Sequence, residues 1–126
     1  DAERKTEKNT GLVFVLAINY GSRQEIVDAV KGVCARVIDG RIDPNDLDEE
    51  EFSKYLYTSG LPDPDLLIRT SGEIRLSNFL LWQLSYAEMY FSKVYWPDFR
   101  REEFELALKD YQRRQRRFGN IAPNRK

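Results

Sequence analysis

The chain has 126 residues, of which 41% are hydrophobic and 13% aromatic, so it is long enough to bury the core of one domain or of part of one. Its 20 basic and 21 acidic residues leave a formal net charge of -1, which excludes a whole-protein field that would hold nucleic acid or an acidic membrane. With no histidine and one cysteine, the chain excludes Ser-His-Asp and Cys-His catalysis, histidine-bound metals, thiolate metal clusters and an internal disulfide.

Residues 12–18 form the longest apolar run, and its β-branched residues predict a strand that is covered on both faces in a parallel sheet. The run is too short to span a bilayer, and the polar residues 1–10 lack signal-peptide character. We therefore expect a cytoplasmic protein. Residues 1–10 and 121–126 are expected to be peripheral or flexible parts of one domain, residues 1–126.

Two helices are predicted next. Ser22 and Glu25 have capping-box spacing at the start of a helix that Gly40 ends. Asp48 is placed to cap a second, short helix, with Glu51 three residues further on.

A second apolar run, residues 65–68, predicts a buried strand that opens into the polar loop 69–73. Ser77 or Asn78 is then expected to cap a third helix that extends to Tyr86. Residues 89–91 have the aromatic character of a third strand.

A long final helix is predicted from Pro97-Asp98, and it ends in the basic run 113–117. Strands that alternate with helices predict an α/β fold with a mostly parallel sheet flanked by helices. Ligands of such sheets bind beyond the carboxyl ends of the strands. Only about three strands can be drawn, whereas sheets usually have about five or six, so one sheet edge is expected to lack its neighbours.

Arg69 and Arg75 flank the loop at the end of the second predicted strand, and Ser77 stands at the predicted start of a helix. Guanidinium groups, a hydroxyl and a helix N-terminus together suit a diphosphate. The spacing alone fits two solvated arginines and an ordinary helix cap slightly better, because it matches no recognised phosphate loop.

Glu88 lies in largely apolar sequence and needs a partner if it is buried. Two partners are open: a magnesium ion shared with a diphosphate, or an arginine in a structural ion pair. The basic run 113–117 is explained by the dipole at the end of its helix.

Several segments closely resemble the cis-prenyltransferases of the undecaprenyl diphosphate synthase type. They are Asn19-Tyr20-Gly21-Ser22-Arg23, the block from Asp65 to Gln83, Ala87-Glu88, Trp96-Pro97-Asp98-Phe99 and Arg116-Arg117-Phe118-Gly119. The resemblance runs from about Asn9 to Asn120 with the order and spacing of the family's C-terminal half. The block from Arg69 to Gln83 is highly diagnostic.

The resemblance implies that the chain binds isopentenyl diphosphate through Arg69, Arg75 and Ser77. Arg117 and Gly119 match an Arg-x-Gly element that reaches the diphosphate across a homodimer interface. Glu88 is implied to help hold Mg2+, from the other subunit of the dimer or from the adjacent shell. Glu73 and Asn19 are further candidates close to the site.

The implied reaction adds isopentenyl units to farnesyl diphosphate and makes undecaprenyl diphosphate, the lipid carrier precursor for bacterial cell-wall (peptidoglycan) synthesis. The family's N-terminal Asp-Gly-Asn-Gly-Arg-Trp motif, with its aspartate, is not in this chain. The resemblance therefore implies an incomplete domain that has no catalytic residue of its own and is inactive alone.

One alternative within the family is a non-catalytic partner subunit of a heteromeric cis-prenyltransferase, although such a subunit would not need Arg69, Arg75, Ser77 and Glu88. Binding to nucleic acid through the terminal arginines is not expected, because acidic residues balance the charge. Membrane association is expected to be at most peripheral, through the lipid product.

Overall fold

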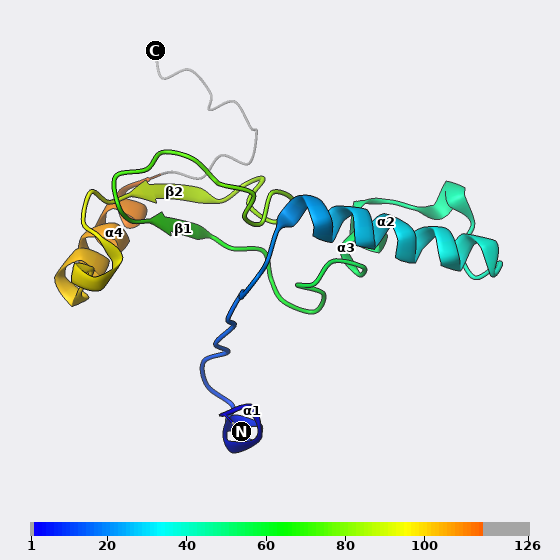
Figure 1. The fold of residues 1–126 in the computed structure, drawn as a ribbon, viewed down its shortest axis with the longest axis horizontal. Coiled ribbons are helices and arrows are strands. Elements are labelled where there is room, and N and C mark those ends of the chain that lie inside the picture. The colour runs from blue at the N-terminus through cyan, green and yellow to red at the C-terminus, as the bar shows by residue number, and fades with distance from the viewer. Residues whose placement is uncertain (1, 115–126) are drawn as a thin grey trace, which may run out of the picture.

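The computed structural model describes residues 2–114. Its main elements are two helices, α2 (Ser22–Ile38) and α4 (Arg101–Arg113), and two strands, β1 (Leu66–Arg69) and β2 (Glu88–Phe91). Short helical segments complete it: α1 (Ala2–Thr6), α3 (Glu49–Ser53) and the 3-10 turns Pro44–Asp46 and Trp96–Asp98. The sheet and α4 lie at one end of the molecule, and α2 and α3 at the other (Figure 1).

The two strands form a parallel sheet, in which Leu66 pairs with Glu88 and Arg69 with Phe91. Helix α4 packs against β2. Both strands and their parallel direction were predicted from the two short apolar runs, and the α/β class is confirmed. Loop residues after each strand are joined as well, because the amide of Ser71 donates to the carbonyl of Val94 over 2.8 Å.

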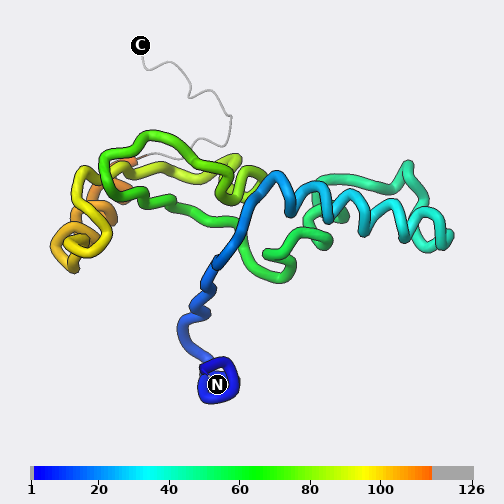
Figure 2. Tube along the Cα trace, viewed as in Figure 1, coloured from blue at the N-terminus to red at the C-terminus, as the bar shows by residue number. Residues whose placement is uncertain are grey.

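Residues 12–18 do not form the predicted strand. Their apolar side chains are exposed, Leu12 by 90% and Phe14 by 76%. A strand needs a neighbouring backbone to bond to, and within residues 2–114 β1 and β2 pair only with each other. The segment instead runs away from the sheet between α1 and α2 (Figure 2).

Helix α2 begins at the predicted residue, but the predicted capping box is wrong. Its N-cap is Gly21, which has no side chain to cap the helix. Ser22 and Glu25 are instead fully buried and make contacts to distant segments. Ala29 and Val33 bury the middle of the helix. Helix α3 does have the predicted cap, since Asp48 Oδ1 accepts from the amide of Glu51 over 2.7 Å.

The third predicted helix, from Ser77 to Tyr86, is also wrong. This segment is a series of bends and turns. Ser77, Asn78 and Leu80 have positive φ angles of 52°, 61° and 45°, which the first turn of a right-handed helix does not allow. The helix N-terminus that was predicted to contribute N–H groups to an anion site beside Ser77 is therefore absent.

The last helix starts later than predicted. Residues Trp96–Asp98 form a separate 3-10 turn, and α4 begins at Arg101. Ala107 is the buried residue of α4. Within residues 2–114, no helix is both long and apolar enough to cross a membrane.

Candidate functional site

A pocket of about 210 Å³ lies at the carboxyl end of β1. This is the edge at which parallel sheets usually bind their ligands. Arg69, the last residue of β1, and Arg75 both line it. The other lining residues are Leu67, Ile68, Thr70, Leu76 and Phe79. The two arginines that the sequence placed at a diphosphate site therefore do lie on one cavity.

Arg69 is held on the wall of this pocket by Ser77. Its Nη1 donates a hydrogen bond to Ser77 Oγ over 3.0 Å. Its Nε is buried and, within the described residues, has no hydrogen-bond partner. A buried N–H of a charged group is costly without an acceptor. The Arg69 guanidinium thus lines the pocket with one N–H group that has no acceptor among the described residues.

Arg75 is placed differently, because its side chain is 62% exposed and forms an ion pair with Glu73. An exposed pair of this kind contributes little to stability, at most about 1 kcal/mol. Arg75 can therefore exchange Glu73 for an anionic ligand at small cost. Glu73 is not among the residues that line the pocket, and it is linked to the pocket by its ion pair with Arg75.

Glu88 lies elsewhere. It is the first residue of β2 and pairs with Leu66, so it stands at the opposite end of the sheet from Arg69. Its Oε2 accepts from Arg114 Nη1 over 2.8 Å. Arg114 also contacts Asp110 over 2.6 Å. The hydrogen bonds that Arg114 donates to Glu88, and then to Asp110, raise the pKa of Arg114 above its usual value, so its guanidinium stays charged.

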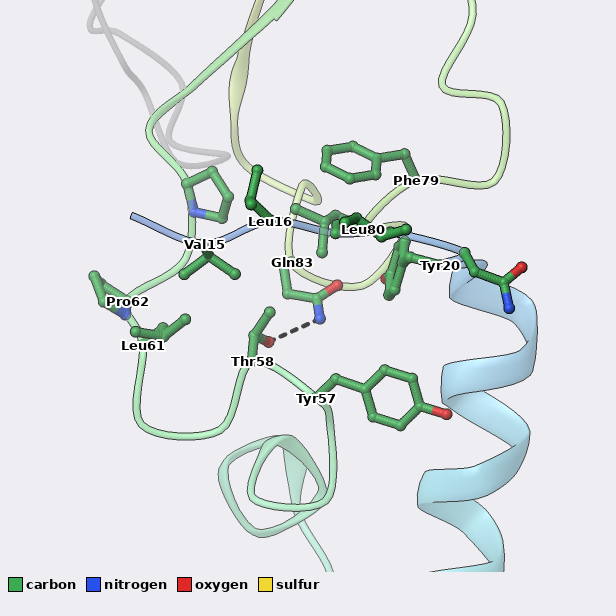
Figure 3. Close-up of a pocket in the computed structure, with 14 residues that line it drawn as sticks. Val15, Leu16, Tyr20, Tyr57, Thr58, Leu61, Pro62, Phe79, Leu80 and Gln83 are labelled. Atoms are coloured by element: carbon green, nitrogen blue, oxygen red, sulfur yellow. Dashed lines mark hydrogen bonds between the residues drawn. The ribbon is translucent and has the colours of Figure 1, made fainter. Parts of the chain in front are cut away.

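A second, larger cavity of about 450 Å³ is mainly apolar. Figure 3 shows it between the segments before α2, after α3 and before β2. Asn19 lines this cavity and is not among the residues that line the arginine pocket. Phe79 lines both cavities. The pocket that Arg69 and Arg75 line therefore adjoins the apolar cavity at Phe79.

A buried carboxylate that the sequence analysis misassigned supports the wall of the apolar cavity. Glu25 is fully buried and accepts hydrogen bonds from the Tyr20 hydroxyl and the Tyr57 amide. Gln83 Nε2 donates to Glu25 over 3.2 Å and to Thr58 Oγ1 over 2.9 Å. Burial, followed by the bond to Glu25, raises the pKa of Tyr20 above its usual value. Glu25 thus joins three segments that are distant in sequence.

Two predicted site residues, Arg117 and Gly119, lie outside the described residues. Within residues 2–114 no group of three or more acidic, cysteine or histidine side chains is arranged to hold a metal ion. Any cation held by Glu88 would need the oxygens of a ligand as well, as Mg2+ commonly does.

Residues 1–119 match the family model described as "Putative undecaprenyl diphosphate synthase". Among similar proteins is the "Tritrans,polycis-undecaprenyl-diphosphate synthase (geranylgeranyl-diphosphate specific)" of Methanocaldococcus jannaschii. It is 58% identical over 94% of this chain and 43% of its own length. The "Ditrans,polycis-undecaprenyl-diphosphate synthase ((2E,6E)-farnesyl-diphosphate specific)" of Legionella pneumophila is 51% identical over 97% of this chain and 51% of its own length.

The fold has a solved counterpart in lavandulyl diphosphate synthase from Lavandula x intermedia, crystallised with dimethylallyl diphosphate. That structure superposes with a TM-score of 0.91 and 45% sequence identity, and the match covers 94% of this chain and 51% of the plant enzyme. This chain spans about half the length of the curated relatives it matches. It therefore belongs to the undecaprenyl diphosphate synthase family of cis-prenyltransferases.

Proposed function

We propose that this chain supplies the isopentenyl diphosphate site of a cis-prenyltransferase. The enzyme would add isopentenyl units to farnesyl diphosphate and make undecaprenyl diphosphate, the lipid carrier precursor for bacterial cell-wall synthesis. The observation that carries the proposal is the shared pocket of Arg69 and Arg75 at the carboxyl end of β1, where Arg69 Nε is buried without a partner among residues 2–114. A diphosphate provides several oxygens for two such guanidinium groups.

The neighbouring apolar cavity supports a ligand that is a diphosphate at one end and a hydrocarbon at the other. Phe79 borders both spaces, so one molecule could place its charged end beside the arginines and its apolar end beside the ring. A sugar phosphate, which has no hydrocarbon end, would bury little apolar surface against this wall.

Farnesyl diphosphate and the undecaprenyl product are proposed from the family. The Legionella relative is named for farnesyl diphosphate, the Methanocaldococcus relative for geranylgeranyl diphosphate, and the plant structure contains dimethylallyl diphosphate. The family thus uses allylic diphosphates of different length. We choose farnesyl diphosphate as the first allylic substrate to test.

In the proposed reaction Arg69 and Arg75 bind the diphosphate of isopentenyl diphosphate, and the Ser77 hydroxyl orients Arg69. Mg2+ would supply positive charge that stabilises the diphosphate as it leaves the allylic substrate. Glu88 is the residue we propose for the ion, since the bond from Arg114 Nη1 is to one carboxylate oxygen, Oε2, and Mg2+ prefers few carboxylates together with phosphate oxygens.

Glu88 stands at the far end of the sheet from Arg69. This separation favours a role for Glu88 in the diphosphate site of another subunit over a role in the site of its own chain. We therefore propose a homodimer in which Glu88, and with it Arg117 and Gly119, serves the partner's diphosphate site. The cytoplasmic location expected from the sequence stays a prediction.

A chimaera tests the proposal, because the chain covers half of its relatives. The matched region of the Legionella synthase is replaced by this chain, and incorporation of labelled isopentenyl diphosphate onto farnesyl diphosphate is measured with Mg2+. We expect a long cis-polyprenyl product, with its length read by chromatography. A folded chimaera without incorporation would favour the alternative, a non-catalytic partner subunit of a heteromeric cis-prenyltransferase.

A further inference from the structure

Asn78 lies in sequence between two residues of the candidate site. Ser77 holds Arg69 by a hydrogen bond, and Phe79 lines both cavities. Asn78 itself lines neither cavity. Its φ angle of 61° is left-handed, a conformation that asparagine tolerates better than most residues but that still needs support from its surroundings.

That support comes from the start of α2. The carbonyl of Asn78 accepts from the amide of Ser22 over 2.8 Å, and its Oδ1 accepts from the amide of Arg23 over 2.8 Å. Both amides belong to the first turn of a helix, where no carbonyl of the helix itself can accept from them. Asn78 therefore does for α2 what its own N-cap residue, Gly21, cannot do.

Two further features fix this contact. The amide of Leu81 donates back to Ser22 Oγ over 2.9 Å, and Ser22 is fully buried. A Cβ atom on Gly21 would lie 2.9 Å from Asn78 Nδ2, so glycine leaves the space that the asparagine side chain fills. Residues 78–81 are thus attached to the helix by backbone and side-chain bonds together.

We infer that Asn78 is a positioning residue for the diphosphate site. Its two bonds to α2 fix the backbone of residues 77–79, and through that backbone they set the Ser77 hydroxyl beside Arg69 and the Phe79 ring against both cavities. The inference rests on the proposed function and adds to it a residue that touches no ligand. It also gives α2, which lines no part of the arginine pocket, a role in shaping it.

The test compares two substitutions that keep the backbone conformation. Asn78→Gly accepts the positive φ angle without strain but removes the side-chain acceptor, whereas Asn78→Asp keeps an oxygen at the same place. Asn45→Gly is the matched control, because Asn45 is an exposed asparagine whose side chain donates to the nearby Asp43 and, among the described residues, to no distant segment. Binding of inorganic diphosphate to the full chain is measured by calorimetry, and folding of each variant by circular dichroism.

We expect Asn78→Gly to weaken binding about tenfold, as small displacements of positioning groups do, while Asn78→Asp and Asn45→Gly stay within about twofold of the parent. In the Legionella chimaera, Asn78→Gly should raise the KM for isopentenyl diphosphate and leave the KM for farnesyl diphosphate unchanged. A general loss of stability would not change the KM for isopentenyl diphosphate while leaving the KM for farnesyl diphosphate unchanged.

Equal diphosphate binding by the parent chain and Asn78→Gly would overturn the inference, and so would equal loss in the glycine and aspartate variants. A folded parent chain that binds no diphosphate would overturn it together with the site. If the binding pattern holds but the chimaera incorporates no isopentenyl diphosphate, the positioning role stands and the proposed reaction fails.

Discussion

Glu88 and Arg69 lie at opposite ends of the same pair of parallel strands, because the register pairs Glu88 with Leu66 and Arg69 with Phe91. Three residues of a strand separate the two positions, about 10 Å along the sheet. A metal ion held by Glu88 is therefore not expected to meet a diphosphate held by Arg69 of the same chain.

Glu88→Gln tests the proposed role of this carboxylate. The amide keeps the shape of the side chain but loses the charge that Mg2+ requires, so we expect the Mg2+ concentration for half-maximal activity of the chimaera to rise about tenfold. The control is Glu105→Gln, since Glu105 also pairs with an arginine, Arg101, over 2.8 Å. An unchanged Mg2+ requirement would leave Glu88 with only its ion pair to Arg114.

Glu25→Ala should lower the free energy of unfolding by about 3 kcal/mol. The substitution leaves a cavity and removes the acceptor for the Tyr20 hydroxyl, the Tyr57 amide and the Gln83 amide group. Glu25→Gln preserves an acceptor and should cost clearly less. Urea unfolding, followed by circular dichroism, measures the free energy of unfolding of both variants, and Glu7→Ala, at an exposed glutamate, is the control. A decrease below about 1 kcal/mol for Glu25→Ala would show that these bonds do not hold the three segments together.

Tyr57→Phe should reduce stability in a pH-dependent way. The Tyr57 hydroxyl, then Lys31 and Gln24, donate to Asp28 and hold the pKa of its carboxyl below the usual 3.8. A group whose pKa is depressed by folding stabilises the protein above its unfolded pKa, and this contribution is lost as the pH falls through the folded value.

The difference in stability between the parent and Tyr57→Phe should therefore be full at pH 7 and shrink below 3.8. Urea unfolding at pH 7 and at a pH below 3.8 measures this difference in stability, and Tyr95→Phe, at an exposed tyrosine, is the control. A difference that is independent of pH would mean that the hydroxyl does not act through Asp28.

The exposed apolar segment 12–18 should make the isolated chain self-associate. Its residues are uncharged, several are β-branched, and their backbone groups have no hydrogen bonds to other residues of 2–114, which favours pairing with another strand. We expect Phe14→Lys to lower the light scattering of concentrated samples, while Tyr95→Lys, at a separate exposed aromatic residue, has little effect. Equal scattering by the two variants would place the association elsewhere.

The parts of the fold that were predicted depend on local patterns. β1 and β2 are short apolar runs that end in polar loops, and Asp48 caps α3 through a residue three positions away. Arg69 and Arg75 could be assigned to one site because both flank the same loop.

The parts that could not be predicted depend on long-range contacts. Ser22 and Glu25 have the spacing of a local cap, but Glu25 bonds to residues 32 and 58 positions further on. No local pattern shows that Asn78 caps a helix 55 residues earlier, or that Ser77 and Leu80 adopt positive φ angles. Residues 12–18 have the composition of a strand, yet composition does not supply the neighbour that a strand needs.

The most direct test of the arginine pocket is the affinity of the chain for isopentenyl diphosphate with Mg2+, measured by calorimetry for the parent and for Arg75→Ala. Arg101→Ala is the control, because it removes another exposed arginine that pairs with a glutamate. We expect weak binding by the parent and by the control. Arg75→Ala loses one charge-assisted contact, so its binding should be at least about tenfold weaker than that of the parent, or undetectable. Identical titration curves for the parent and Arg75→Ala would contradict the assignment of this pocket to the diphosphate.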